Sequence, residues 1–149
     1  MLGYGVLRST QVQTFLGQRF AAYLSRQLDT KVSVSKVDVT FFLNFVLEDV
    51  SVEDQRGESM IFSKRMVVDV GRFSIRKRFL NVNGIFLDQT FLGLSRYSGE
   101  GDFNFQFLID YFSDDDSLPT ENRWKVVCKS LEFNKSAFTF NDYNKVLTE

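Results

Sequence analysis

The stretch TQVQTFLGQRFAAYLSRQL, Thr10 to Leu28, is followed closely by KVSVSKVDVTFFLNFVLEDVSVED, Lys31 to Asp54, and these two segments decide the fold. The first repeats its apolar residues with the period of an α-helix, and the second alternates apolar and polar residues as β-strands do. This order predicts an α+β, mainly β chain in which an N-terminal amphipathic helix packs on, or at the end of, a sheet.

The helix of residues 10–28 has a predicted start and a predicted buried face. Thr10 and Gln13 fit a capping box, in which each side chain satisfies a backbone N–H of the first turn. An apolar stripe ~120° wide predicts the face that packs on the sheet, and it consists of Val12, Leu16, Phe20, Tyr23 and Leu24. Arg19 and Arg26 flank this stripe, so the alternative is a basic helix that lies on anionic lipid.

Alternation in the strand region shifts by one residue at several places. The apolar positions change parity at Ser35-Lys36, Gly71, Asn83-Gly84 and Lys129-Ser130. Such a shift needs a bulge or a turn if one face is to stay buried, and glycine suits either. Because bulged strands bend, the sheet is predicted to be curved.

Other alternating runs predict strands at 45–53, 59–62, 91–96 and 137–141, with turns at 54–57 and 98–101. Their short spacing favours antiparallel pairing throughout residues 31–143. Residues 103–112, FNFQFLIDYF, fit either a strand or a short helix, and we favour a helix capped by Asp102 that buries Phe105, Leu108, Ile109 and Phe112. The chain is thus predicted to be a single domain, residues 1–149, with an acidic loop at 113–121.

Composition argues against several functional classes. A net charge of −1 gives no general attraction to nucleic acid, so no nucleic-acid partner is expected. The sequence has no histidine, which removes the usual general base near neutral pH and the commonest metal ligand. The single cysteine, Cys128, cannot form an internal disulfide and is expected to be a buried strand thiol.

Carboxylate clusters do not restore an enzymatic interpretation. Asp114, Asp115 and Asp116 are consecutive, whereas calcium loops use alternate residues and a turn glycine. Glu48 and Asp49 are neighbours in a predicted strand, so their side chains point to opposite faces and cannot share a substrate. We therefore predict a protein that is not an enzyme and has no cofactor and no metal site.

A basic cluster is the most conspicuous charged feature of the sequence. It consists of Arg65, Arg72, Arg76, Lys77 and Arg78. These side chains would each gain ~1 kcal/mol beside anionic lipid head groups. The alternative is that they solubilise the outer face or edge of the sheet.

The N-terminus also bears on the membrane. No run reaches the ~20 apolar residues that cross a bilayer, and the apolar segment 2–7, which ends at Arg8, is too short for a signal peptide. Residues 1–9 are interpreted as the residual tail of a removed membrane anchor, the alternative being an ordinary frayed terminus.

Taken together, several phrases resemble a known family. They are QTFLGQRFAAYLSRQLDTKVSVSKVDV, FVLEDVSVEDQRGE, LNVNGIFLDQTFLGLSR, DFNFQFLIDYFS and WKVVCKSLEFNKSAFTFNDY. In order and content they are similar to the membrane-proximal N-terminal part of TamB, the translocation and assembly module subunit of the AsmA-like superfamily, in its Bacteroidota form. The resemblance covers nearly the entire chain.

The resemblance implies a non-enzymatic module of a protein anchored in the inner membrane by one helix and extending through the periplasm as a curved, apolar β-groove. It implies phospholipid acyl chains and an outer-membrane assembly-type barrel protein as partners. The implied groove residues are Val50, Val52, Val68, Val70, Leu80, Val82, Leu92 and Leu94. The alternative function is a scaffold that docks partners by adding strands to its sheet edge.

Overall fold

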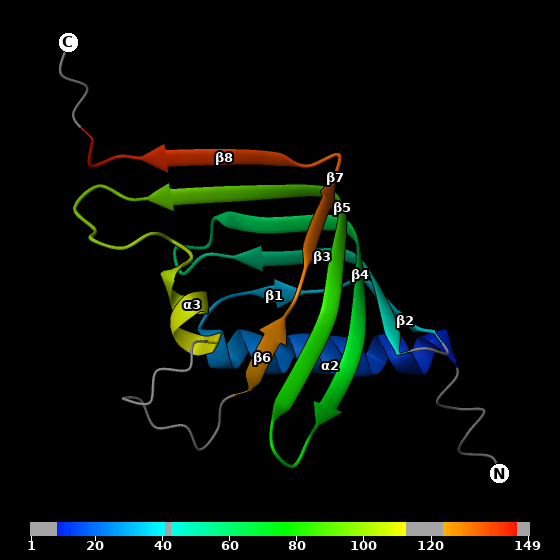
Figure 1. The fold of residues 1–149 in the computed structure, drawn as a ribbon. Helices are drawn as coiled ribbons and strands as arrows, with labels where there is room; N and C mark the ends of the chain where they lie inside the picture. Colours follow the sequence, from blue (N-terminus) through cyan, green and yellow to red (C-terminus); the bar gives the residue numbers. More distant parts are fainter. Residues whose placement is uncertain (1–8, 41–42, 113–123, 146–149) are drawn as a thin grey trace.

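The computed structural model describes residues 9–40, 43–112 and 124–145 and shows two helices and an eight-stranded sheet (Figure 1). Helix α2 (Thr10–Leu28) comes first. It is followed by β1 (Val32–Ser33), β2 (Lys36–Val39), β3 (Asn44–Glu53), β4 (Ser59–Ser74) and β5 (Phe79–Arg96). The remaining elements are α3 (Gln106–Phe112), β6 (Lys125–Cys128), β7 (Leu131–Asn134) and β8 (Ala137–Asp142). The predicted α+β, mainly β architecture is confirmed.

The pairing of the strands is mixed. β1 and β2 follow one another along one side of β3, and β3, β4 and β5 are antiparallel neighbours, as predicted. β6, β7 and β8 follow one another along the far side of β5, but they run parallel to it. Parallel neighbours require a long crossover, and the segment that contains α3 separates β5 from β6. The prediction of antiparallel pairing from short spacing is therefore wrong for β6, β7 and β8, which follow this long connection.

Residues with a left-handed backbone conformation lie in a line across the sheet where it bends. Asp49 in β3 and Gln89 in β5 have φ angles of 50° and 49°, and Lys135, between β7 and β8, has 48°. The alternation of faces is interrupted here, because Ser63 is buried and Arg65 is exposed although they are two residues apart. Figure 1 shows the corresponding sharp turn partway along β4 and β5. The predicted curvature is thus present, and this line of bends adds to the sites that alternation indicated.

A second line of irregularity runs through the predicted glycine positions. The register between β4 and β5 shifts between Asp69 and Val70 and again before Arg72, beside Gly71. The junction of β6 and β7 lies opposite, since the Ile85 N–H donates to the Ser130 carbonyl at 3.0 Å. A Cβ on Gly84 would lie 2.8 Å from the Ser130 Oγ, so glycine permits this close approach.

Helix α2 has the predicted bounds but not the predicted packing face. The side that meets the sheet carries Gly17, Ala21 and Leu28, and a Cβ on Gly17 would lie only 2.3 Å from Val37 Cγ2. The predicted stripe points elsewhere, because Leu16 and Phe20 are 52% and 50% exposed. The helix therefore packs through Gly17, Ala21 and Leu28 rather than through the predicted stripe.

Helix α2 packs in this way because β1 and β2 form an edge of the sheet, and the backbone groups of that edge need partners. Thr14 Oγ1 accepts from the Val37 N–H at 3.1 Å and donates to the Val37 carbonyl at 3.3 Å. Ser25 Oγ accepts from the Val32 N–H at 2.8 Å and lies 3.1 Å from the Val32 carbonyl. Polar side chains of the helix thus cover the edge, which apolar ones cannot do.

The same requirement overturns the predicted capping box. Helix α2 has Ser9 at its N-cap position without a side-chain cap. Gln13 Oε1 instead accepts from the Val39 N–H at 2.8 Å, and the Thr10 hydroxyl bonds to Asp38 and helps to lower the pKa of that carboxyl. Both residues of the supposed box therefore hold the helix to β2.

The predicted second helix is present as α3, but its buried side chain differs. Tyr111 is buried, whereas Ile109, expected in the core, is 50% exposed. Phe105, Leu108 and Phe112 are half-buried. Asp110 and Gln106, one turn apart, are joined by a 3.0 Å hydrogen bond on the outer side of α3.

Candidate functional site

One face of the sheet is apolar across its full width, because aligned residues of neighbouring strands point to the same side. One row consists of Val32, Val52, Ile61, Leu92 and Phe138. Beyond the bend, the next rows consist of Val37, Leu47, Met66, Leu87 and Phe133, and of Val39, Phe45, Val68, Ile85 and Leu131. This apolar face is the candidate binding surface.

All of the predicted groove residues lie on the apolar face. Val52 and Leu92 belong to the first row, and Val68 belongs to the third. Val50 pairs with Ser63, Val70 with Val82, Leu80 with Phe73 and Leu94 with Phe140. Val70 and Val82 are buried, and the others are half-buried.

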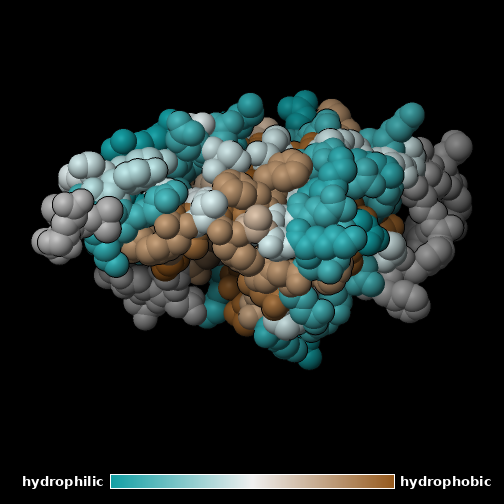
Figure 2. All heavy atoms as spheres, turned by 90° about the horizontal axis from the view of Figure 1, so that it is seen from above, coloured by the Kyte–Doolittle hydropathy of each residue, from teal (hydrophilic) through white to brown (hydrophobic). Residues whose placement is uncertain are grey.

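The apolar face is open along β7 and β8. Leu131, Phe133, Phe138 and Phe140 are 55%, 42%, 57% and 59% exposed. Figure 2, which views this side from above, shows hydrophobic residues gathered in the middle between hydrophilic margins. Contiguous apolar surface of this kind marks a binding site more often than isolated exposed residues do.

A buried polar pair interrupts the apolar face at the line of bends. Ser63 and Thr90 are 0% and 2% exposed, and their hydroxyl oxygens are 2.8 Å apart. Ser63 Oγ also lies 2.9 Å from the Arg65 carbonyl. The pair is therefore satisfied within the protein and stabilises the bend.

Cys128 is exposed, which contradicts the expectation of a buried thiol. It pairs with Val82, whose other neighbour is Val70, and so belongs to the apolar face near its open side. Its thiol donates to the Ser130 carbonyl at 3.2 Å. Cys128 lies in a strand, as predicted, but at the edge of the sheet, where its side chain stays exposed.

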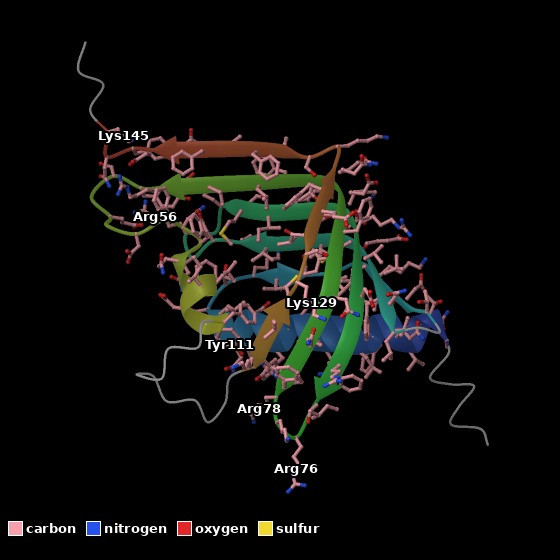
Figure 3. All side chains as sticks on the ribbon, in the orientation of Figure 1. Arg56, Arg76, Arg78, Tyr111, Lys129 and Lys145 are labelled. Carbon is pink, nitrogen blue, oxygen red and sulfur yellow. The ribbon has the colours of Figure 1, made fainter. Side chains whose placement is uncertain are left out.

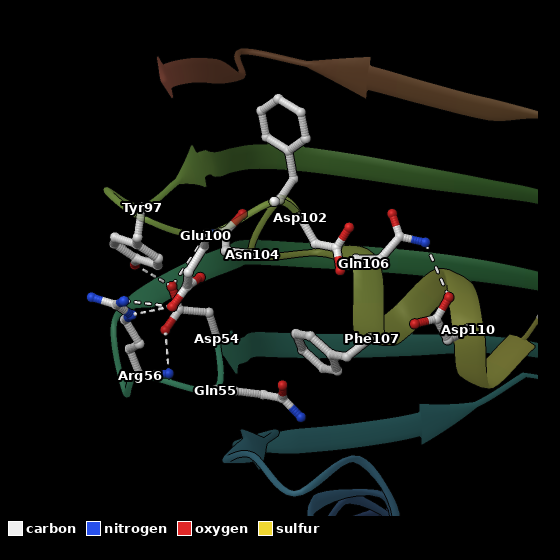
Figure 4. Close-up of a pocket in the computed structure, with 12 residues that line it drawn as sticks. Asp54, Gln55, Arg56, Tyr97, Glu100, Asp102, Asn104, Gln106, Phe107 and Asp110 are labelled. Carbon is white, nitrogen blue, oxygen red and sulfur yellow. Dashed lines mark hydrogen bonds and ion pairs between the residues drawn. The ribbon is translucent and has the colours of Figure 1, made fainter. Parts of the chain in front are cut away.

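A polar corner lies where the β3–β4 turn meets the segment between β5 and α3 (Figure 4). Asp54, only 1% exposed, accepts the N–H groups of Arg56 and Glu58 through Oδ1 at 2.9 Å and 3.0 Å. Through Oδ2 it accepts the Tyr97 hydroxyl and, at 3.2 Å, the Asn104 amide. Sequence reasoning missed this role, although an aspartate that opens a turn two residues before its N–H partner is a recognisable signal.

The electrostatics of the polar corner follow from these bonds. Burial alone raises the pKa of Asp54, but the bonds from Tyr97, Glu58, Asn104 and Arg56 outweigh it and hold the pKa below its ordinary value. Burial, and then the bond to Asp54, raise the pKa of Tyr97 to about 12. With every acceptor position of Asp54 occupied, the corner is suited to holding two loops together and not to proton transfer.

Two hollows adjoin the polar corner. One of about 490 Å³ is lined by polar side chains that include Glu100, Asp102 and Asp110. Another of about 540 Å³ includes Phe91 and Thr139 in its lining. The predicted groove residues line neither hollow.

The structure divides the predicted basic cluster. Arg65 lies between Glu48 and Asp88 in a row of the opposite face. The other four, Arg72, Arg76, Lys77 and Arg78, lie at the hairpin between β4 and β5 (Figure 3). We call Arg72 to Arg78 the basic hairpin.

Other predicted features give no further site. Within residues 9–40, 43–112 and 124–145, no three carboxylates or cysteines are grouped to hold a metal ion. No helix in those ranges is both long and apolar enough to span a bilayer. Residues 1–8, of the proposed anchor tail, and Asp114 to Asp116 lie outside the described residues.

Comparison with known proteins adds no relative to this picture. No family model, no curated protein and no solved structure matches the chain.

Proposed function

We propose that this chain is a non-enzymatic, lipid-handling module of the cell envelope, similar to the N-terminal part of TamB. In this proposal it belongs to a protein anchored in the inner membrane and crossing the periplasm. It takes part in phospholipid transport and outer-membrane protein assembly. The observation that carries the proposal is the apolar face, which spans the sheet and is about half exposed at β7 and β8.

Physical chemistry supports an acyl chain as the occupant. At ~4.8 Å per strand, a row of five strands is ~19 Å wide. Removing an acyl chain from water onto this surface gains ~0.8 kcal/mol per buried CH₂. Such binding needs no polar contact, and Ser63 and Thr90, the buried polar side chains of this face, already bond to each other.

Native mass spectrometry of the chain with phospholipid tests the proposal. Phe140→Glu should abolish the lipid adduct, because Phe140 is exposed on the apolar face, paired with Leu94. Thr139→Glu is the matched control, since this exposed neighbour points to the other face. Absence of an adduct with the unmodified chain at excess lipid, or equal adducts in both variants, refutes lipid binding.

A second candidate function is docking of an extended partner strand. Among the described residues, β8 pairs only with β5, so its other edge offers backbone groups to a new strand. The outer-membrane barrel protein is the proposed partner. Hydrogen exchange separates the two functions. If the chain docks a partner strand, adding the partner should slow the exchange of β8 amides in the Phe140→Glu variant as much as in the unmodified chain.

A further inference from the structure

We propose that the basic hairpin, together with Trp124, is a docking tip for an anionic membrane surface. The hairpin is built by a tight turn in which the Arg78 N–H donates to the Ile75 carbonyl at 3.2 Å. Ser74 Oγ accepts from the Lys77 N–H, also at 3.2 Å. In Figure 3, Arg76 points away from the body of the protein at the end of the hairpin.

The first observation is a local excess of positive charge. Residues 70–87 contain the four cations of the basic hairpin and no carboxylate. Residues 124–131, which include β6, add Lys125 and Lys129 and again no carboxylate. Because the whole chain has a net charge of −1, the rest of its sequence is net acidic. Carboxylates gather at the polar corner, beyond the opposite end of β5.

The second observation is that the same tip presents apolar side chains to solvent. Ile75 is 72% exposed, the largest value among the exposed large apolar side chains of the described residues, and Phe73 is 54% exposed. An isoleucine at the end of a hairpin is costly in water and favourable in a bilayer. Apolar residues ringed by cations are the composition of segments that enter the interface of anionic membranes.

The third observation is the place of the only tryptophan. The Lys125 N–H donates to the Arg78 carbonyl at 2.8 Å, so Trp124, the preceding residue, lies beside the hairpin. Tryptophan is enriched where proteins cross the membrane–water interface. A nucleic acid would also attract the cations, but it offers no apolar medium for Ile75.

The inference does not depend on lipid binding by the apolar face. Docking at the tip would, however, set the orientation of the apolar face relative to the membrane, because β4 and β5 run from the docking tip into that face. A membrane held at the tip would therefore lie at the start of the apolar face, and the acidic polar corner would lie away from the membrane.

Trp124 provides the assay. Its fluorescence should shift to the blue, and brominated acyl chains should quench it, with vesicles of phosphatidylcholine and phosphatidylglycerol but not with phosphatidylcholine alone. Arg76→Gln with Lys77→Gln should weaken binding about 30-fold, since each cation contributes about fivefold. Ile75→Ser, which leaves all charges in place, should weaken binding at least ~10-fold.

The matched control removes two exposed cations elsewhere, Lys135→Gln with Lys145→Gln, and should bind as the unmodified chain does. Equal binding to both kinds of vesicle, normal binding by the hairpin variants, or stronger binding to duplex DNA than to anionic vesicles would overturn the inference. Phe140→Glu should still dock, so failure of lipid binding by the apolar face and failure of docking are distinguishable.

Discussion

Replacing Asp54 by asparagine tests whether the polar corner holds the fold together. The substitution keeps the size of the side chain and an oxygen that can accept from the N–H groups of Arg56 and Glu58. It places an NH₂ group where Oδ2 accepted from Tyr97 and Asn104. The Tyr97 hydroxyl can rotate to accept, but the Asn104 NH₂ cannot, because its Oδ1 already accepts from the Ser95 N–H at 3.0 Å.

The expected loss follows from these bonds. One bond to a charged group, worth ~1.5–3 kcal/mol, is lost, and the others weaken to the ~0.5–1.5 kcal/mol of neutral bonds. Relief from burying a charge offsets part of this loss. We therefore expect Asp54→Asn to lower the free energy of unfolding by about 2 kcal/mol at neutral pH, measured from urea denaturation followed by circular dichroism.

The pH dependence is a stricter test. Because the folded-state pKa of Asp54 lies below the ordinary value of 3.8, its stabilisation is present above that value and disappears as pH falls through the folded pKa. The difference between Asp54→Asn and the unmodified chain should accordingly narrow below about pH 4. Asp102→Asn, an exposed neighbour, is the control and should change little. A difference below ~0.5 kcal/mol at neutral pH, or one that persists in acid, refutes the reasoning.

Other predictions concern α2 and the β5–β8 pair. Thr14→Val should cost ~1–2 kcal/mol in denaturant titration, because it leaves the Val37 N–H without its partner; an unchanged midpoint would contradict this role. Gly17→Ala should destabilise by ~1–3 kcal/mol despite alanine's higher helix propensity, since its Cβ meets Val37; a rise in stability would show that the helix moves freely. Asp142→Asn should remove the ion pair with Arg96 and speed exchange of β8 amides about tenfold, with no change in β3 amides.

Much of the fold follows from the sequence because its signals are local. The bounds of α2, the presence of α3 and the irregularities at Gly71 and Gly84 all depend on periodicity and turn chemistry over a few residues. Leu87 and Leu92 have opposite parity in the sequence yet share the apolar face, so the alternation between them also indicates the bend at Gln89.

The errors arise where distant segments decide the outcome. The apolar stripe of α2 indicates a core-facing side, yet the backbone groups at the edge formed by β1 and β2 select Thr14 and Ser25. The exposure of Cys128 depends on β6 being at the sheet edge, and that depends on a parallel crossover. The separation of Arg65 from the basic hairpin depends on its position along β4, where it pairs with Glu48 and Asp88, and a list of charges does not contain this pairing.

The packing of α2 also determines where the sheet can be extended. Since side chains of α2 satisfy backbone groups of β1 and β2, that edge is closed to a further strand. The opposite edge, at β8, has no partner strand among the described residues, and its apolar side chains are more than half exposed at Phe138 and Phe140. Extension or docking is therefore directed to the β8 edge. There a new strand would lengthen the apolar rows, so binding a partner strand and enlarging the lipid surface would be one structural event.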